Sequence, residues 1–120
     1  MNARVYFHLS LKINEGKIDA FRNIADEMSA MTSKESGALG YEWYLNADST
    51  ECRLVETYAN EAAVMAHIDG KTVRDLLPRL LQASSITSFG VYGNPGAQAT
   101  ERLRAAGAVL FQQIGGIVRP

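Results

Sequence analysis

Cysteine is almost absent from this sequence of 120 residues, in which Cys52 is the only one. A single thiol cannot form an intrachain disulfide, so nothing indicates an oxidising compartment. Long apolar runs are missing too: no stretch approaches the roughly 20 residues of a membrane span, and residues 1–5 do not resemble a signal peptide. We therefore expect a cytoplasmic protein with no membrane partner, in which Cys52 is a buried strand residue.

An excess of charge of either sign is also missing. Twelve Lys and Arg stand against thirteen Asp and Glu, and the formal net charge is -1. Proteins that bind nucleic acids usually carry a basic patch. The sequence therefore favours no nucleic-acid partner.

Signature motifs of several common chemistries are absent as well. The glycines lack the spacing of a phosphate-binding loop, and no serine lies in a nucleophile elbow. The two histidines, His8 and His67, and the distant cysteine have no metal-ligand spacing. We therefore expect neither a metal nor another cofactor.

Two kinds of hydrophobic periodicity are present in the first third of the sequence. Residues 4–13 alternate, which is typical of a strand with one apolar face, and the apolar residues are Val5, Phe7, Leu9, Leu11 and Ile13. Residues 17–35 then repeat apolar side chains every three or four positions, which predicts an amphipathic helix. Asn14 is a candidate cap for its start, and Gly37 a candidate for the left-handed position after its end.

The middle of the sequence predicts a hairpin followed by two helical pieces. Residues 39–46 and 52–58 are rich in aromatic and branched side chains and flank a turn-forming stretch. Asn60 can then cap a helix over 61–68. A second helical piece is expected over 72–82, kinked or divided by Pro78.

A last strand is predicted over residues 85–92. In that strand Phe89 and Val91 would face one way and Ile86 and Tyr92 the other. A short helix over 96–106 and a strand or extended arm over 109–118 would follow.

The predicted order, β-α-β-β-α-β, is that of a ferredoxin-like α+β fold with its helices on one face of the sheet. The other face, which carries Tyr6 and His8, would be left bare. Because such a face needs a cover, we expect a homodimer in which two copies of the sheet pack together.

Two segments carry a family resemblance. Residues 35–45 read Glu-Ser-Gly-Ala-Leu-Gly-Tyr-Glu-Trp-Tyr-Leu, and residues 54–62 read Leu-Val-Glu-Thr-Tyr-Ala-Asn-Glu-Ala, followed by His67. In this order and spacing they resemble the antibiotic biosynthesis monooxygenase family. The resemblance covers about residues 4–93 and defines the expected domain, 1–93. Residues 94–120 would be an extension, packed on the same domain or on the partner subunit.

The resemblance implies a dimeric α+β barrel whose characterised enzymes oxidise aromatic or quinol-like compounds with molecular oxygen, without metal, flavin or haem. Residues 68–72 depart from the common family pattern. Leu76 occupies the region where the haem-degrading branch has a histidine, so the sequence does not favour haem.

The candidate catalytic residue is His67, because an imidazole can accept a proton from a phenolic substrate near neutral pH. The alternative is a structural histidine bonded to a carbonyl or to a carboxylate such as Glu56. Glu56 itself is either part of the substrate site or one half of a structural ion pair.

The candidate substrate-binding residues are aromatic. Tyr41 and Trp43 share one face of a strand and could stack on a flat substrate, or simply pack in the core or the dimer interface. Tyr58, which shares a strand face with Glu56, could donate a hydrogen bond to a substrate oxyanion. Phe89 is also a candidate substrate-binding residue.

Three functions fit these observations. The first is a cofactor-independent monooxygenase acting on a small aromatic or quinol-like compound. The second is a dimeric small-molecule binding protein without turnover. The third is an isomerase or detoxifying enzyme that uses His67 to move protons without oxygen.

Overall fold

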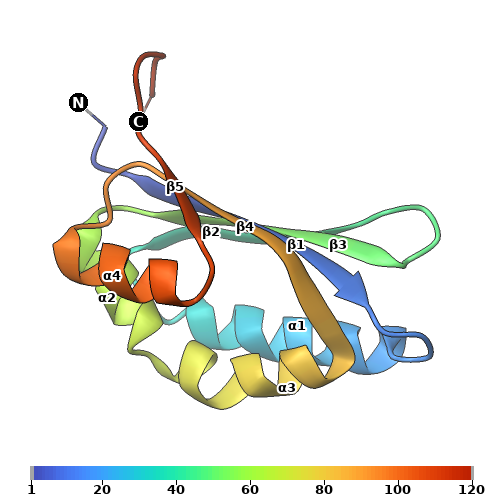
Figure 1. Ribbon diagram of the computed structural model, residues 1–120. Helices are drawn as coiled ribbons and strands as arrows, with labels where there is room; N and C mark the ends of the chain where they lie inside the picture. The colour runs from blue at the N-terminus through green and yellow to red at the C-terminus, as the bar shows by residue number, and fades with distance from the viewer. Residues whose placement is uncertain (1, 120) are drawn as a thin grey trace.

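The computed structural model describes residues 2–119 as a sheet backed by helices (Figure 1). The elements in chain order are β1 (Val5–Ile13), α1 (Ile18–Thr32), β2 (Ala38–Leu45), β3 (Glu51–Tyr58), α2 (Glu61–Ile68), the π-helical turn η1 (Thr72–Leu76), α3 (Leu77–Ala83), β4 (Ser84–Tyr92), α4 (Ala97–Ala105) and β5 (Val109–Phe111).

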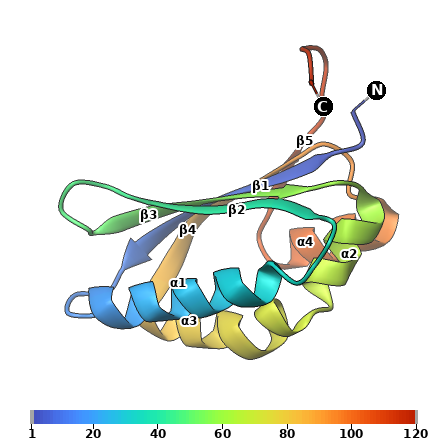
Figure 2. The same ribbon diagram turned by 180° about the vertical axis from the view of Figure 1, so that it is seen from behind.

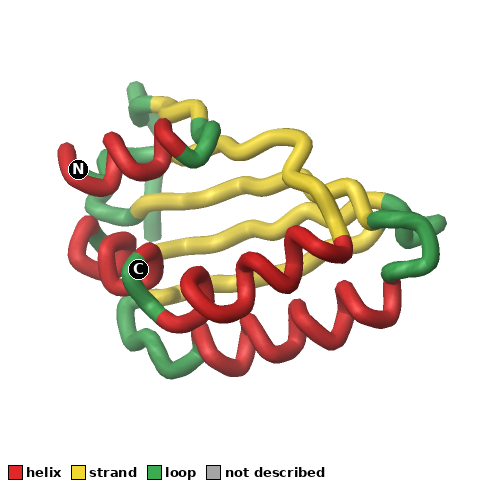
Figure 3. Tube along the Cα trace, turned by 60° about the horizontal axis from the view of Figure 1, so that its bottom comes forward, coloured by secondary structure: helices red, strands yellow, loops and turns green. Residues whose placement is uncertain are grey.

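The strands form one sheet in the order β2-β3-β1-β4-β5. The first four pair antiparallel, and β5 adds to β4 in parallel. All helices lie on one face, as Figures 1 and 2 show from opposite sides and Figure 3 from beneath. The predicted ferredoxin-like α+β fold is confirmed. Within residues 2–119, no helix is both long and apolar enough to cross a membrane.

The core lies between the sheet and the helices. The alternation predicted for β1 is confirmed: Val5, Phe7 and Leu9 point inward and are buried, whereas His8 on the other face is exposed. Cys52 is buried in β3, as expected. The apolar stripe of α1 covers this inner face of the sheet.

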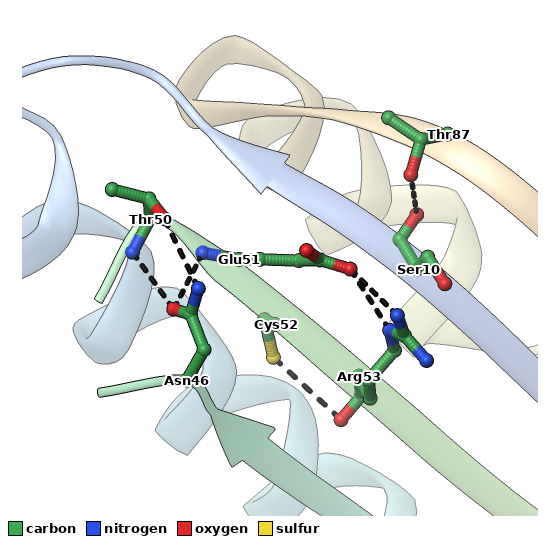
Figure 4. Close-up of polar contacts among 7 residues, drawn as sticks. All are labelled: Ser10, Asn46, Thr50, Glu51, Cys52, Arg53 and Thr87. Carbon is green, nitrogen blue, oxygen red and sulfur yellow. Dashed lines mark hydrogen bonds and ion pairs between the residues drawn. The ribbon is translucent and has the colours of Figure 1, made fainter. Parts of the chain in front are cut away.

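The predicted hairpin between β2 and β3 is confirmed, and an asparagine organises its turn (Figure 4). The Asn46 side-chain oxygen accepts hydrogen bonds from the backbone N–H groups of Thr50 and Glu51, at 3.0 and 2.9 Å. Because an asparagine side chain can imitate a backbone acceptor, it closes such a turn without help from other elements.

A β-bulge in β4 overturns one prediction about strand faces. Ser10 pairs with Ser88 but Leu11 pairs with Ile86, so Thr87 is an extra residue. Its hydroxyl donates to the backbone oxygen of Ser10 at 3.2 Å (Figure 4). An extra residue shifts the alternation by one position, so Ile86 faces the interior with Phe89 rather than away from it.

Helix termini agree with the sequence in one case and differ in another. Asn60 caps α2, as predicted, by accepting from the backbone N–H of Ala63 at 3.0 Å. The predicted cap by Asn14 is wrong, because α1 begins after Lys17 and the Asn14 amide donates instead to the backbone oxygen of Gln82. The chain does divide near Pro78, which lies in the first turn of α3 after η1.

The prediction of a left-handed backbone at Gly37 is also wrong, since the glycines with positive φ are others. Gly37 is needed for a close approach instead. A Cβ atom added there would lie 2.4 Å from the Cβ of Ala63 in α2. The small residue therefore lets the chain between α1 and β2 pack directly on the helix that carries His67.

Replacing Gly37 with alanine is expected to destabilise the fold by about 1–3 kcal/mol, because neither backbone can move aside without repacking α2. Chemical denaturation measures the change. Gly115→Ala is the matched control, since its added Cβ meets nothing within 4 Å and its cost should stay within about 0.5 kcal/mol. Equal stabilities of the two variants would contradict the close-packing argument.

Candidate functional site

A cavity of about 240 Å³ lies between the inner face of the sheet and the helices. Its walls are mostly aliphatic, with Leu9, Leu11 and Leu54 from the sheet and Met28, Val73 and Leu77 from the helical side. Apolar cavities with a few converging polar groups are the usual form of small-molecule sites.

Glu56 and His67 are the buried polar groups in this wall, only 4% and 3% exposed. Glu56 is at an inward position of β3, two residues from the buried Leu54. His67 lies on the inner face of α2, three residues after the buried Val64. The alternation of side chains along β3 and the helical periodicity of α2 thus direct Glu56 and His67 into the same cavity.

His67 connects two carboxylates. Its Nδ1 is 3.1 and 3.2 Å from the two carboxylate oxygens of Glu35, and its Nε2 is 3.5 Å from Oε1 of Glu56. The Tyr58 hydroxyl donates a short hydrogen bond to the same oxygen of Glu56. Glu35, His67, Glu56 and Tyr58 therefore form one contiguous polar network, called here the Glu35–His67–Glu56 network.

Burial sets the protonation of this network. It raises the pKa of Glu56 to about 8, against the effect of the Tyr58 hydrogen bond and with a further contribution from the charge of Glu35. Burial also lowers the pKa of His67, although Glu35 opposes the shift. At neutral pH Glu56 is therefore mostly a neutral acid and His67 a neutral imidazole.

Two tyrosines stand beside the network as neutral phenols. Burial, followed by the charge of Glu56, raises the pKa of both Tyr41 and Tyr58 above the usual value. Their rings lie 5.7 and 5.1 Å from the His67 ring, measured between centroids. A protonated phenol can donate a hydrogen bond to an oxygen that gains negative charge.

The structure brings together most of the residues singled out from the sequence. His67, Glu56, Tyr41 and Phe89 line the cavity. Tyr58 is fully buried and reaches the site through its bond to Glu56.

Trp43 shares a strand face with Tyr41, as predicted, but points to a different part of the interior. Its ring packs edge-on against Phe21, and its Nε1 donates to the Ser29 hydroxyl at 2.9 Å. Trp43 is therefore not among the residues that line the cavity. It supports the contact between β2 and α1.

Two residues of the site were not identified from the sequence. Glu35 follows α1 and was noted only as part of a motif, because no spacing along the chain connects it with His67. Arg102 of α4 also lines the cavity. Its segment lies in the extension, where the resemblance gave no guide.

Groups that could hold a metal are not clustered in the part of the chain that the structure describes. Within residues 2–119, no three His, Cys, Asp or Glu side chains lie together in a suitable arrangement. What the site offers is a set of proton donors and acceptors beside an apolar space.

The chain is similar to known proteins in sequence, through a family model, and in fold, through solved structures. The family model described as antibiotic biosynthesis monooxygenase matches residues 4–79. No curated protein sequence is significantly similar to the chain.

Several solved structures share the fold. MupZ from Pseudomonas fluorescens is 22% identical with a TM-score of 0.84, over 99% of this chain and 97% of that one. SnoaB from Streptomyces nogalater, a cofactor-independent oxygenase, is 11% identical with a TM-score of 0.68, over 79% and 96%. Rv0793 from Mycobacterium tuberculosis is 20% identical with a TM-score of 0.64, over 78% and 97%.

Proposed function

We propose, from the premise that this chain belongs to the antibiotic biosynthesis monooxygenase family, that it oxidises a small aromatic or quinol-like compound with molecular oxygen and without a cofactor. The observation that carries the proposal is the buried Glu35–His67–Glu56 network, which opens on an apolar cavity. The description of SnoaB as a cofactor-independent oxygenase agrees with it.

The network supports the first step of such a reaction, removal of a proton from the substrate. The neutral His67 imidazole and the ionised fraction of Glu56 both present basic atoms at the cavity wall. A pKa of about 8 places Glu56 near the operating pH, which favours proton transfer in either direction. Glu35, with its side chain 19% exposed, would connect His67 with water outside.

The second step belongs to the substrate. The anion is electron-rich and reduces oxygen, so that one oxygen atom enters the product and the other leaves as water. The apolar wall keeps water from reprotonating the anion. Tyr41 would donate a hydrogen bond to the oxygen on which its charge develops.

Oxygen consumption tests this proposal. The purified protein is offered a panel of polycyclic phenols and hydroquinones without added metal or flavin, and ¹⁸O from labelled oxygen is followed into the product. Uptake that depends on the protein, with incorporation of label, supports the proposal. Absence of uptake across a broad panel counts against it.

A second candidate is proton transfer without oxygen, as in an isomerase or a detoxifying enzyme. It is favoured by Glu56 being mostly protonated at neutral pH, which makes it a ready general acid. This reaction would continue anaerobically and introduce solvent deuterium into the substrate. A binding protein without turnover would instead show only thermal stabilisation by the ligand.

We also propose that the chain is a homodimer formed by the outer face of the sheet, the face without helices. Tyr44, Val109 and Phe111 are about half exposed there, at 54%, 58% and 48%. A groove on this face is lined by His8, Val55 and other residues. Exposed apolar side chains at both edges of one sheet face are typical of a surface that is covered in the assembly.

Placing a charge in this face is expected to separate the subunits. Val55→Asp should raise the dimer dissociation constant by at least about 100-fold, because an unpaired carboxylate would be buried in the interface. Analytical ultracentrifugation measures it. Leu81→Asp, at a 42% exposed position on the helical side, is the control. A wild-type protein that sediments as a single subunit would refute the dimer.

A further inference from the structure

One guanidinium group lies at the mouth of this mostly aliphatic cavity. Arg102 is the only cation among the described residues that line the cavity, and its side chain is 44% exposed. The next residue, Leu103, is 5% exposed and forms part of the inner wall. Helix α4 thus closes one side of the cavity with an aliphatic side chain and places a positive charge where the cavity meets water.

Arg102 has a partner that a ligand could replace. Its Nη1 donates to Oδ1 of Asp69, whose side chain is 60% exposed. An ion pair so open to water contributes little to stability, so exchanging one carboxylate for another costs little. The planar guanidinium can also bind a carboxylate with two parallel hydrogen bonds.

The ion pair also lies close in the sequence to one of the reacting groups. Asp69 follows α2 directly, two residues after His67. Because Arg102, His67 and Glu56 all line the same cavity, a molecule whose acid group bonds to Arg102 could reach the other two residues with its apolar end. The arrangement suits a ligand with one anionic end and one apolar end.

We propose that Arg102 is a carboxylate subsite, and that the substrate is an apolar, ring-bearing acid held by its carboxylate at the mouth while its other end reaches Glu56 and His67. The part of this proposal that places the substrate's other end at Glu56 and His67 rests on the proposed function. The carboxylate subsite at Arg102 does not, because it concerns binding alone. Helix α4 lies beyond residues 4–79, so the selectivity would belong to the C-terminal part of this chain.

Two probes of equal shape test the subsite: 4-ethylbenzoate and its neutral analogue 4-ethylbenzamide. Affinities are measured by NMR titration of the full-length protein. The wild type is expected to bind the acid at least about tenfold more tightly than the amide, since a charged pair at a partly dry site gains more than a neutral one. Equal affinities, or no measurable binding of either probe, would overturn the proposal.

Two variants separate recognition from a merely structural ion pair. Arg102→Met keeps an apolar stem over the cavity and should abolish the preference for the acid while leaving the affinity for the amide within about twofold. Asp69→Asn should strengthen binding of the acid, because it removes the competing carboxylate. If both variants weaken both probes alike, Arg102 only holds α4 in place and the proposal fails.

The failure of this subsite is distinguishable from failure of the proposed function. The probe titrations need no turnover, and His67→Gln should leave the preference for the acid unchanged. If the protein oxidises a neutral quinol but shows no preference between the two probes, the subsite is wrong and the oxygenase stands. If the preference for the acid is present but no oxygen is consumed, the subsite stands and the proposed oxygenase is wrong.

Discussion

Replacing His67 with glutamine is expected to lower kcat by about 10²- to 10⁴-fold, the range that a positioned acid or base contributes. Glutamine fills much of the imidazole volume and can still bond to Glu35, but it cannot accept a proton. Its effect should therefore be on the reaction rather than on the fold. The measurement is kcat with the compound that the oxygen panel identifies, together with the unfolding midpoint.

His8→Gln is the matched control, since His8 lies on the outer face of the sheet and does not line the cavity. It should retain kcat. The double variant His67→Gln, Glu56→Gln should lose little more than either single one, because groups that act as a unit are not additive. A His67→Gln protein with wild-type kcat would remove His67 from the chemistry.

The pH dependence of kcat/KM distinguishes a role of Glu56 as the base, as in the proposed oxygenase, from a role as the acid, as in proton transfer without oxygen. If Glu56 acts as a base, activity should rise with pH until the group with a pKa of about 8 is ionised. If Glu56 acts as an acid, activity should fall through the same range. The geometry is the same in both cases, so this profile assigns the role of Glu56.

The sheet was predictable because its signals are local. Alternation from Val5 to Ile13 places each side chain relative to the core without knowledge of any other element. The cap by Asn60 was equally local, since it involves only the next three residues. The predicted orientation of Ile86 was wrong because a single extra residue, Thr87, reverses the faces of the strand. Nothing in the composition of β4 indicates where that extra residue occurs.

The site was only partly predictable because its contacts are long-range. Glu56 and His67 could be suspected individually from strand and helix position. The contact of His67 with Glu35 joins the ends of two helices, and no periodicity indicates it. Arg102 enters the cavity wall only because α4 folds back beneath the sheet (Figures 1 and 3).

Replacing Glu56 with glutamine is expected to stabilise the protein at high pH. Because burial raises the pKa of Glu56 from 4.5 to about 8 in the folded state, both states are protonated below about pH 4.5 and the residue carries no penalty. Between these values the unfolded chain is ionised while the folded one is not, so the wild type loses stability as pH rises. Above about pH 8 the loss is complete.

Glutamine is neutral at every pH and can still accept the Tyr58 hydrogen bond, so it avoids this loss. The difference in unfolding free energy between Glu56→Gln and the wild type should therefore grow from pH 4.5 to pH 8 by several kcal/mol, up to about 5 kcal/mol at roughly 1.4 kcal/mol per pKa unit. Urea denaturation at a series of pH values measures it. Glu101→Gln on α4 controls for the loss of one carboxylate from the net charge.

A constant difference between Glu56→Gln and the wild type would mean that Glu56 is already ionised in the folded protein and acts through its charge. A difference in unfolding free energy that grows with pH, together with a loss of kcat in Glu56→Gln, would mean that Glu56 is kept at a cost in stability. That combination is expected of a buried acid retained for its chemistry, because a group kept only for packing would be more stable as the neutral amide.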